Sequence, residues 1–408
     1  MSYRDGSLCP AVVVPLHETG LEVVRALGRR GVPVIGVDED AHRPGAHSRY
    51  CRRVVRSPIE GEALAATLLA IGAHLQTKAA LFPCGDPQVL CVAEYREALS
   101  RHYLFNLPDV EVVATLMHKD RFADFATRHG YPVPQTFVVG NVQEVQRAAQ
   151  AIRYPCILKP AVRSVAWEAR RMPKNYVVHS ADALRAAYAA CHKLVPQAVV
   201  QEWIPGSDEE VFFCLLYIDT EGRPLVTFTG RKLRQWPPER GCTAIATGHQ
   251  ARELEELTLR FMHEVGFRGL GSMEYRRDPR DGRFVMIEPT VGRIDLQSGV
   301  SELYGVSLPW VAYADVVGVE RSSGNTRMGT GEAKWIHEEG VARLWLRQVR
   351  HGHIRLREWR RLLRGRKRFA VFARDDLTPT VALWCEVARK AWRALINWFT
   401  QLRGNEGE

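Results

Sequence analysis

Apolar and amphipathic stretches alternate through the first hundred residues. Four short apolar runs have the length of strands: AVVVP at 11–15, VPVIGVD at 32–38, VVRSP at 54–58 and AALFP at 79–83. Three further stretches have helical spacing, over 20–30, 61–75 and 87–99. This alternation predicts a doubly wound, Rossmann-like α/β sheet, in which ligands bind at the carboxyl ends of the strands.

After Met117 the pattern changes to one typical of an α+β fold. A helix over 118–129 ends at Gly130, and a Pro-rich segment then leads into a strand. Further strands are predicted at 151–160, 198–203, 210–219 and 224–233, and further helices at 181–192 and 251–265. The residues TEGR between the last two strands are typical of a hairpin turn.

A second hairpin is predicted over residues 271–293, GSMEYRRDPRDGRFVMIEPTVGR. Glu274 and Glu288 lie in its two strands, and a symmetric DPRDG turn would place them directly opposite each other on one face. Two close carboxylates repel unless one is protonated or a cation lies between them. Mg²⁺ suits such a pair, because it binds one or two carboxylates together with nucleotide phosphates. The alternative is that two exposed glutamates pair with Arg276 or Arg277.

The composition is that of a globular protein with one unusual segment. The 408 residues carry a formal net charge of +10, and residues 341–370 hold 11 Lys/Arg and a single acid, Glu358. The rest of the chain has 45 basic and 45 acidic residues, so the basicity is local and does not describe a general nucleic-acid surface. Nine cysteines without CxxC or Cys/His spacing indicate reduced thiols and argue against zinc. Without a signal-peptide pattern or a long apolar run, the sequence predicts a cytoplasmic protein.

Several charged residues further along the chain favour nucleotide binding. Lys159 ends a buried strand, and Lys119 begins a helix, where an ammonium is unfavourable unless an anion lies nearby. The run VVQEWIPGSDEE offers an apolar strand end for adenine, followed by Asp208 and Glu210 at a distance suited to ribose hydroxyls. Each residue alone is equally consistent with an ordinary surface charge, so the prediction depends on their joint order.

The turn after the first predicted strand reads His17-Glu18-Thr19-Gly20. It lacks the GxGxxG spacing, so it does not support dinucleotide binding. Thr19 is predicted to cap the following helix.

In this order the motifs resemble those of the ATP-grasp superfamily, specifically its D-aspartate ligase-like and carbamoyl-phosphate-synthase-like carboxylate–amine ligases. The resemblance spans roughly residues 10–315 and rests on LFPCGD, HKDRFADFATRHGYPVP, ILKP, VVQEWIPGSDEE and GSMEYRRD…DGRFVMIEPTVGR. It implies a Rossmann-like pre-ATP-grasp domain over 1–115 and a two-lobed ATP-grasp domain over 116–320. A basic, helix-rich C-terminal region over 321–408 lies outside the resemblance.

The resemblance also implies roles for individual residues. It assigns the α- and β-phosphates to Lys119 and Lys159, adenine to Gln201, Glu202, Trp203 and Ile204, and the ribose to Asp208, with Glu210 nearby. It assigns Mg²⁺ to Glu274, Glu288 and Thr290, and the reacting phosphate, carboxylate or acyl phosphate to Arg293, Arg231, Arg234 and Lys174.

Two departures from the family pattern accompany this assignment. Thr290 stands where many relatives have an asparagine ligand, and Arg293 comes one residue later than in an EINPR-like run. The loop at 162–175 lacks the glycines of many phosphate lids, and Lys174 is its candidate for the γ-phosphate.

The implied activity is ATP- and Mg²⁺-dependent coupling of a small-molecule carboxylate to an amine through an acyl phosphate. His17 and Glu18 are candidates for a general base. One alternative is a degenerate ATP-grasp protein that binds a nucleotide and acts as a membrane-surface adaptor, motivated by Thr290 and the lid. A biotin carboxylase-type reaction is a further alternative, although the chain has no AMKM-like biotinyl segment.

The C-terminal segment 378–403 carries an apolar stripe at helical spacing, formed by Val381, Trp384, Ala388, Trp392, Leu395, Phe399 and Leu402. The favoured interpretation is a terminal helix docked on the ligase body. A second is an interfacial helix that rests, with the basic segment, on anionic lipid at the inner membrane face. Nucleic acid is a third, but no specific recognition motif accompanies the arginines.

Overall fold

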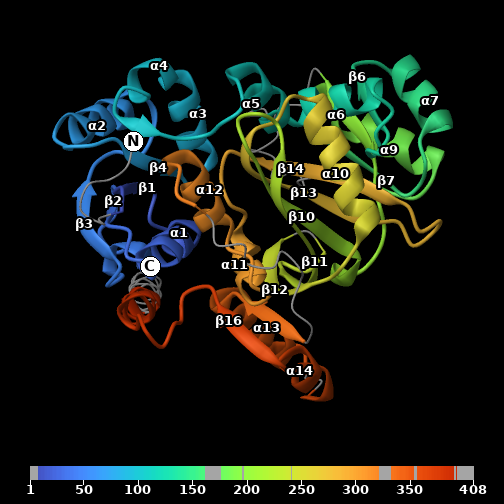
Figure 1. Cartoon of the computed structure of the whole chain (residues 1–408). Coiled ribbons are helices and arrows are strands. Elements are labelled where there is room, and N and C mark those ends of the chain that lie inside the picture. Colours follow the sequence, from blue (N-terminus) through green and yellow to red (C-terminus); the bar gives the residue numbers. More distant parts are fainter. Residues whose placement is uncertain are drawn as a thin grey trace, which may run out of the picture. The chain divides into compact units, whose positions relative to one another are not determined.

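The computed structural model describes residues 8–160, 176–194, 197–239, 241–320, 332–352, 356–389 and 392. The chain forms two compact units. Unit 1 contains Met1–Met117, Phe213–Ser272 and Pro289–Glu408, and unit 2 contains His118–Phe212 and Met273–Glu288. The two units are described separately below, with the elements labelled as in Figure 1.

The first sheet of unit 1 is the predicted doubly wound α/β layer. Its strands are β1 (Ala11–Val14), β2 (Val34–Asp38), β3 (Cys51–Arg56), β4 (Ala79–Pro83) and β5 (Tyr103–Leu104), parallel and in the order β3-β2-β1-β4-β5. The helices are α1 (Glu18–Gly28), α2 (Gly61–Ala73), α3 (Asp86–Glu94) and α4 (Arg96–Leu99). The order reverses between β1 and β4, and open α/β sheets bind ligands at such a switch point.

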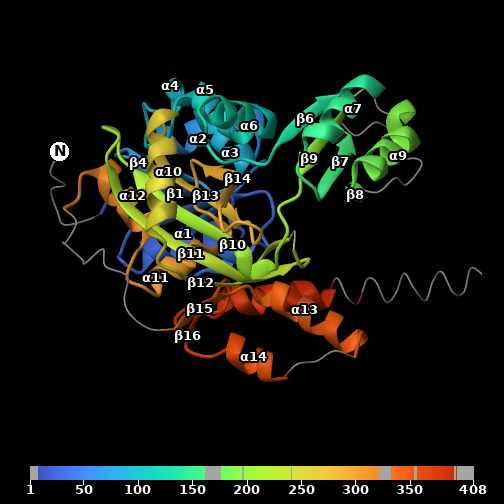
Figure 2. The same ribbon diagram turned by 90° about the vertical axis from the view of Figure 1, so that its right-hand side faces the viewer.

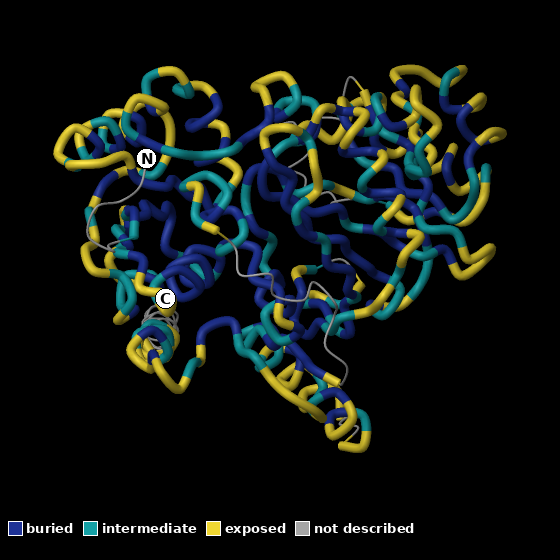
Figure 3. The backbone as a smooth tube through the Cα atoms, in the orientation of Figure 1, coloured by how far each residue is buried: buried dark blue, intermediate teal, exposed yellow. Residues whose placement is uncertain are grey.

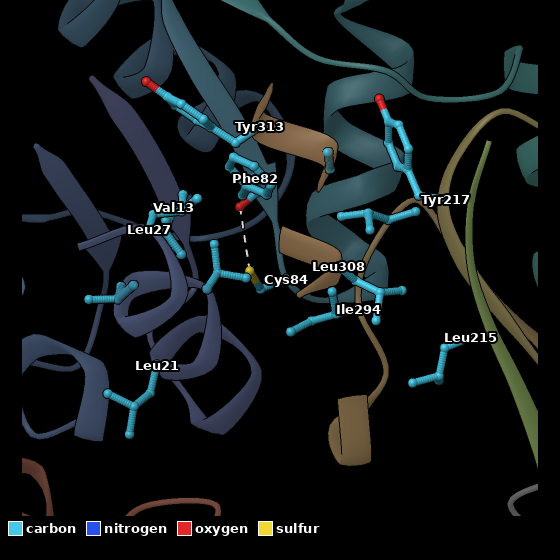
Figure 4. Close-up of a cluster of buried hydrophobic side chains, with 14 of the residues drawn as sticks. Val13, Leu21, Leu27, Phe82, Cys84, Leu215, Tyr217, Ile294, Leu308 and Tyr313 are labelled. Carbon is cyan, nitrogen blue, oxygen red and sulfur yellow. Dashed lines mark hydrogen bonds between the residues drawn. The ribbon is translucent and has the colours of Figure 1, made fainter. Parts of the chain in front are cut away.

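The core of unit 1 explains why β1 and β4 are apolar throughout. All residues of β1 and β4 are buried, as the dark tube in Figure 3 shows. Figure 4 shows Val13, Leu27 and Phe82 within this cluster, where Cys84 Sγ donates to the Phe82 carbonyl at 3.5 Å. Tyr313, from α12 (Leu308–Val317), belongs to the same cluster.

The second sheet has seven strands in the order β14-β13-β10-β11-β12-β15-β16. Their bounds are β10 (Val211–Ile218), β11 (Pro224–Trp236), β12 (Cys242–Gly248), β13 (Gly269–Arg277), β14 (Phe284–Val291), β15 (Ala333–Ile336) and β16 (Arg366–Phe369). Strand β10 is buried along its whole length, and helix α10 (Arg252–Glu264) packs against β11. Both predicted hairpins are therefore present.

Unit 2 is built on an antiparallel four-stranded sheet in the order β6-β9-β7-β8. Its elements are α6 (Lys119–Arg128), β6 (Thr136–Val139), α7 (Val142–Ala151), β7 (Cys156–Pro160), β8 (Tyr176–Val178), α9 (Ala181–Cys191) and β9 (Ala198–Glu202). Helices α7 and α9 begin where Asn141 and Ser180 accept hydrogen bonds from the amides of Glu144 and Ala183. Their apolar faces cover one core with the sheet.

The C-terminal part of unit 1 contains α13 (Glu338–Arg350), α14 (Leu356–Leu362) and a helix over 378–389, and Figure 2 shows α13 and α14 beside β15 and β16. A buried carboxylate attaches this part to α1: Asp376 accepts from Arg25 Nε at 2.9 Å and from the Ser48 hydroxyl at 2.6 Å. Among the described residues, no helix is long and apolar enough to cross a membrane.

Candidate active site

Lys119 and Glu288, which were assigned separately to phosphate and metal, form an ion pair in unit 2. Lys119 is the first residue of α6, and its Nζ lies 3.0 Å from Glu288 Oε2 on β14. The two side chains are 81% and 50% exposed. The anion that the sequence required near this helix start is therefore supplied by Glu288. Because the pair is exposed, it contributes little to stability and leaves both groups accessible to a ligand.

The hairpin that carries Glu274 and Glu288 has a different turn from the predicted one. The amide of Asp278 donates to the carbonyl of Arg283 at 2.8 Å, and the amide of Gly282 donates to the carbonyl of Asp278 at 2.7 Å. This is a bulged turn, which Gly282 permits with a φ of 78°. The turn is therefore closed between residues 278 and 283 and is not the symmetric turn centred on Asp281 that was predicted. The pairing of Glu274 with Glu288 stays a prediction.

Lys159 and Gln201 lie on one face of the unit 2 sheet. Lys159 pairs with Val199 across β7 and β9, and Gln201 pairs with Ile157, so the two side chains are diagonal neighbours. Lys159 Nζ donates to Gln201 Oε1 at 3.2 Å, and Gln201 Nε2 donates to Thr136 Oγ1 at 3.0 Å. The structure thus brings together a residue assigned to phosphate and one assigned to adenine.

Glu202, the next residue of β9, has a structural role that the sequence did not reveal. Its side chain is fully buried, and Oε1 accepts from Arg280 at 2.6 Å and from Arg283 at 3.0 Å. Arg280 also donates to the buried Asp278, which holds the pKa of that carboxyl below its usual value. Since the carboxylate of Glu202 is engaged in this cluster, only its backbone is available to adenine. The alternating charges of DPRDGR were the signal for this cluster.

The residues expected around the ribose lie at the start of β10. Asp208 is buried, and Glu210 forms a two-pronged ion pair with Arg277, at 2.7 and 3.2 Å. Arg276 lies 5.9 Å from the centre of the Trp203 ring, and Ile204 is buried. Glu274 therefore shares its strand with two arginines that are directed to the 203–210 segment.

In unit 1, Arg293 follows β14 and forms an ion pair that the sequence did not predict. Its Nε donates to Asp86 Oδ1 at 2.6 Å, at the first residue of α3. Burial works against the charge of Arg293, but the hydrogen bond to Asp86 keeps its pKa above the ordinary value. The GD of LFPCGD, at the carboxyl end of β4, was the available signal for Asp86.

Arg231 and Arg234 lie on the same side of β11, although they are three residues apart. They pair with Thr247 and Ile245, which are two residues apart on β12, because β11 contains an irregularity at Leu233. Arg234 forms an ion pair with Glu358. Arg231 is half-buried, and Thr290, the third predicted metal ligand, is half-buried on β14.

His17 is held in one tautomer at the carboxyl end of β1. Thr19 Oγ1 lies 2.7 Å from His17 Nδ1 and donates to the Cys84 carbonyl at 2.9 Å. Because a hydroxyl has one hydrogen, it must accept from Nδ1, so neutral His17 presents an unprotonated Nε2. Burial lowers the pKa of His17, and the charges of Arg43 and Arg293 act in the same direction, against Glu18 and Asp38. The prediction that Thr19 caps α1 was wrong, since His17 is the N-cap residue and no side chain caps the helix.

Two of the predicted sites, the lid lysine and the metal site, stay predictions. Lys174 lies outside the described residues. The described residues contain no cluster of three or more His, Cys, Asp or Glu side chains that would hold a metal by themselves. A metal at Glu274 and Glu288 would therefore need oxygen ligands from a bound nucleotide.

Comparison with known proteins identifies this architecture. The chain is 23% identical over 283 residues to the D-aspartate ligase of Enterococcus faecium, covering 65% of this chain and 63% of that protein. It is 22% identical over 279 residues to the formate-dependent phosphoribosylglycinamide formyltransferase of Methanocella arvoryzae, covering 65% and 62%. The chain thus spans less than two thirds of the length of both relatives. No family model matches it.

The solved structures decide the fold. The biotin carboxylase domain of Hydrogenobacter thermophilus 2-oxoglutarate carboxylase, solved with MgADP, ADP and bicarbonate, has a TM-score of 0.59 at 16% identity, over 79% of this chain and 73% of that one. The chain has the ATP-grasp fold. The predicted resemblance to ATP-grasp carboxylate–amine ligases is confirmed, and the exposed Lys119–Glu288 pair and the Lys159–Gln201 pair lie in one compact unit of that fold.

Proposed function

We propose that the protein is an ATP-dependent ligase that activates a substrate carboxylate as an acyl phosphate and couples it to an amine. The observation that carries this proposal is the ion pair of Lys119 with Glu288, at 3.0 Å on an ATP-grasp fold. The lysine assigned to phosphate and the carboxylate assigned to metal are paired with each other and exposed to solvent. When a nucleotide and its cation bind, the lysine can transfer to a phosphate and the carboxylate to the cation.

The residues present fit ATP and Mg²⁺. Glu274 and Glu288 are hard oxygen donors, and two protein carboxylates with nucleotide phosphates form a normal Mg²⁺ environment. Thr290 is a candidate third ligand on the same strand as Glu288. Bound Mg²⁺ supplies electrostatic stabilisation of the charge on the transferring phosphoryl group.

The chain's own side chains supply the remaining positive charge for the transfer. Lys119 and Lys159 hold the phosphates of the nucleotide, with Lys159 oriented by Gln201. Gln201 and the backbone from Glu202 to Ile204 border the adenine, and Asp208 faces the ribose. Arg231, Arg234 and Lys174 are the further candidates for the reacting phosphate or carboxylate.

The amide-forming step would use residues of unit 1. Arg293, oriented by Asp86, stabilises the oxyanion that develops when the amine adds to the acyl carbon. The amine must lose a proton as the C–N bond forms and phosphate leaves. His17 Nε2 is a neutral acceptor for that proton, because the Thr19 hydroxyl keeps the ring proton on Nδ1.

An ADP-release screen across pairs of carboxylic acids and amines, including amino acids and amino sugars, tests the activity. An active pair should depend on both ATP and Mg²⁺, and Glu288→Gln and Lys159→Ala should each abolish ADP formation. With an ¹⁸O-labelled carboxylate, one label should appear in the released phosphate, because the bond that breaks is between the acyl carbon and that oxygen. Full turnover in both variants would refute the proposal.

The same screen distinguishes the alternatives. A nucleotide-binding adaptor would show nucleotide-dependent thermal stabilisation and no ADP with any substrate. A biotin carboxylase-type reaction would require bicarbonate and free biotin. Because a ligase of small metabolites works where ATP is available, we place the protein in the cytoplasm. Its association with a membrane is a separate proposal.

A further inference from the structure

The apolar stripe of the C-terminal helix faces solvent where the structure describes it. Val381, Trp384 and Trp392 are 60%, 51% and 64% exposed, and Ala388 is also exposed. The spacing of Val381, Trp384 and Ala388 places these three on one side of the helix over 378–389. The helix docks on the ligase body, as predicted, but through its other side. Leu395, Phe399 and Leu402 of the stripe lie outside the described residues.

The other side of the same helix is the one that contacts the body. Leu383 packs against the core of unit 1, and Ala382 and Glu386 are half-buried. Since each helical residue advances about 100°, Leu383 points away from Val381 and Trp384. The helix thus has an attached side and an exposed apolar side, and attachment to its own protein does not explain the stripe.

Exposed apolar side chains are concentrated in the C-terminal part of the chain. Of the sixteen large apolar residues that the described chain exposes, ten lie between 345 and 392, including all three exposed tryptophans. Helix α13 contributes Trp345, Leu346 and Val349, and α14 contributes Leu356. Scattered exposed apolar residues are normal, but a concentration of this kind indicates an interaction surface.

This concentration overlaps the basic segment, which contains four of the ten residues, and continues beyond it. Residues 341–370 hold 11 Lys/Arg and one acid, and that acid, Glu358, is paired with Arg234. Arg347, Arg350, Arg357 and Arg360 are all exposed. The C-terminal surface, meaning the exposed residues of 341–392, therefore combines tryptophans and aliphatic side chains with a large excess of positive charge.

We propose that the C-terminal surface binds an anionic lipid bilayer, with the helix over 378–389 lying in the plane of the interface. Tryptophan is favoured at the level of the lipid headgroups, and a basic, amphipathic element is the usual determinant of interfacial binding. Negative headgroups complement the exposed arginines. Nucleic acid would account for the charge but not for the stripe, and a second copy would bring two basic surfaces together.

Co-sedimentation of the full chain with vesicles tests this proposal, with phosphatidylcholine alone and with added phosphatidylglycerol as the two compositions. The protein should bind the anionic vesicles strongly and the neutral ones weakly. The double variant Val381→Ser/Trp384→Ser should weaken binding at least about tenfold, through loss of buried apolar area. Arg347→Gln/Arg350→Gln should weaken it about thirtyfold, since each basic residue near the surface contributes a factor of about five.

Val142→Ser is the matched control, because Val142 is 55% exposed on α7 in unit 2. It should bind like the unchanged protein, and equal melting temperatures should show that all variants are folded.

Failure of the unchanged protein to bind anionic vesicles would overturn the proposal, as would binding that the stripe variant does not weaken. A dimer that dissociates in the stripe variant would assign the stripe to a second copy, and displacement of the vesicles by duplex DNA with equal binding of the stripe variant would assign the surface to nucleic acid. Binding does not depend on ligase activity, so its outcome is independent of the proposed function.

Discussion

The substitution Glu202→Gln should loosen strand β9, because it removes a buried charge that two arginines share. The Glu202 side chain is 0% exposed, and its Oε1 lies 2.6 Å from Arg280 and 3.0 Å from Arg283. Breaking a buried ion pair costs about 3–5 kcal/mol when the partner is left without compensation. Here Arg280 still has Asp278, and the Arg283 side chain is 38% exposed to water. We therefore expect a loss of about 2 kcal/mol.

Hydrogen exchange of the β9 amides in the full chain measures this loss locally, without requiring both units to unfold together. A decrease of about 2 kcal/mol in the free energy of opening corresponds to exchange that is about thirtyfold faster. Asp182→Asn is the control, since that carboxylate is 90% exposed beside Arg185 and should change exchange in β9 by less than about twofold.

The result also separates two roles for Glu202. If the carboxylate contacted adenine, as the sequence implied, the isosteric glutamine would weaken nucleotide binding and leave exchange in β9 unchanged. That outcome would refute the reasoning from the buried cluster. The structure predicts the opposite result. Exchange of the β9 amides should be faster in the variant without nucleotide, and bound nucleotide should partly restore the slower exchange.

Three further predictions concern other charged groups. Lys119→Ala should change the free energy of unfolding by less than about 0.5 kcal/mol, because its pair with Glu288 is exposed, while ADP release in the active assay should fall at least about a hundredfold; a stability loss with unchanged ADP release would contradict this. Because Arg280 lowers the pKa of Asp278, the stability from this carboxylate is present above about pH 4 and lost as pH falls through the folded pKa. The melting temperature should therefore drop more steeply below about pH 4 in the unchanged protein than in Asp278→Asn. Since burial lowers the pKa of His17, nitrogen NMR at pH 7 should show a proton on Nδ1 and none on Nε2, and a protonated Nε2 would contradict the tautomer inferred from Thr19.

Local patterns in the sequence were sufficient for the elements and for much of the residue grouping. Apolar runs of strand length between helical stretches predicted β1, β2 and β4 and their helices, because a strand buried on both faces has no polar side. The order of motifs indicated the ATP-grasp fold. It also selected Lys119 and Glu288, which are 169 residues apart in the chain. In the structure, Lys119 Nζ lies 3.0 Å from Glu288 Oε2.

The tertiary structure decided the features that depend on single insertions or on distant partners. The turn at Gly282 closes between residues 278 and 283 and not symmetrically about Asp281, and one irregularity at Leu233 placed Arg231 and Arg234 on the same side. Periodicity cannot predict such shifts, because the side-chain alternation of a strand reverses with a single extra residue.

Distant partners decided the rest. Glu202 became a buried ion-pair centre because residues 280 and 283 fold back onto it, and Asp86 met Arg293 across 207 residues of chain. The amphipathic pattern of the C-terminal helix was evident in the sequence, but which side is covered depends on the body that Leu383 contacts. A sequence pattern indicates which side chains of a segment can be buried. Only the tertiary structure determines which distant residues cover them.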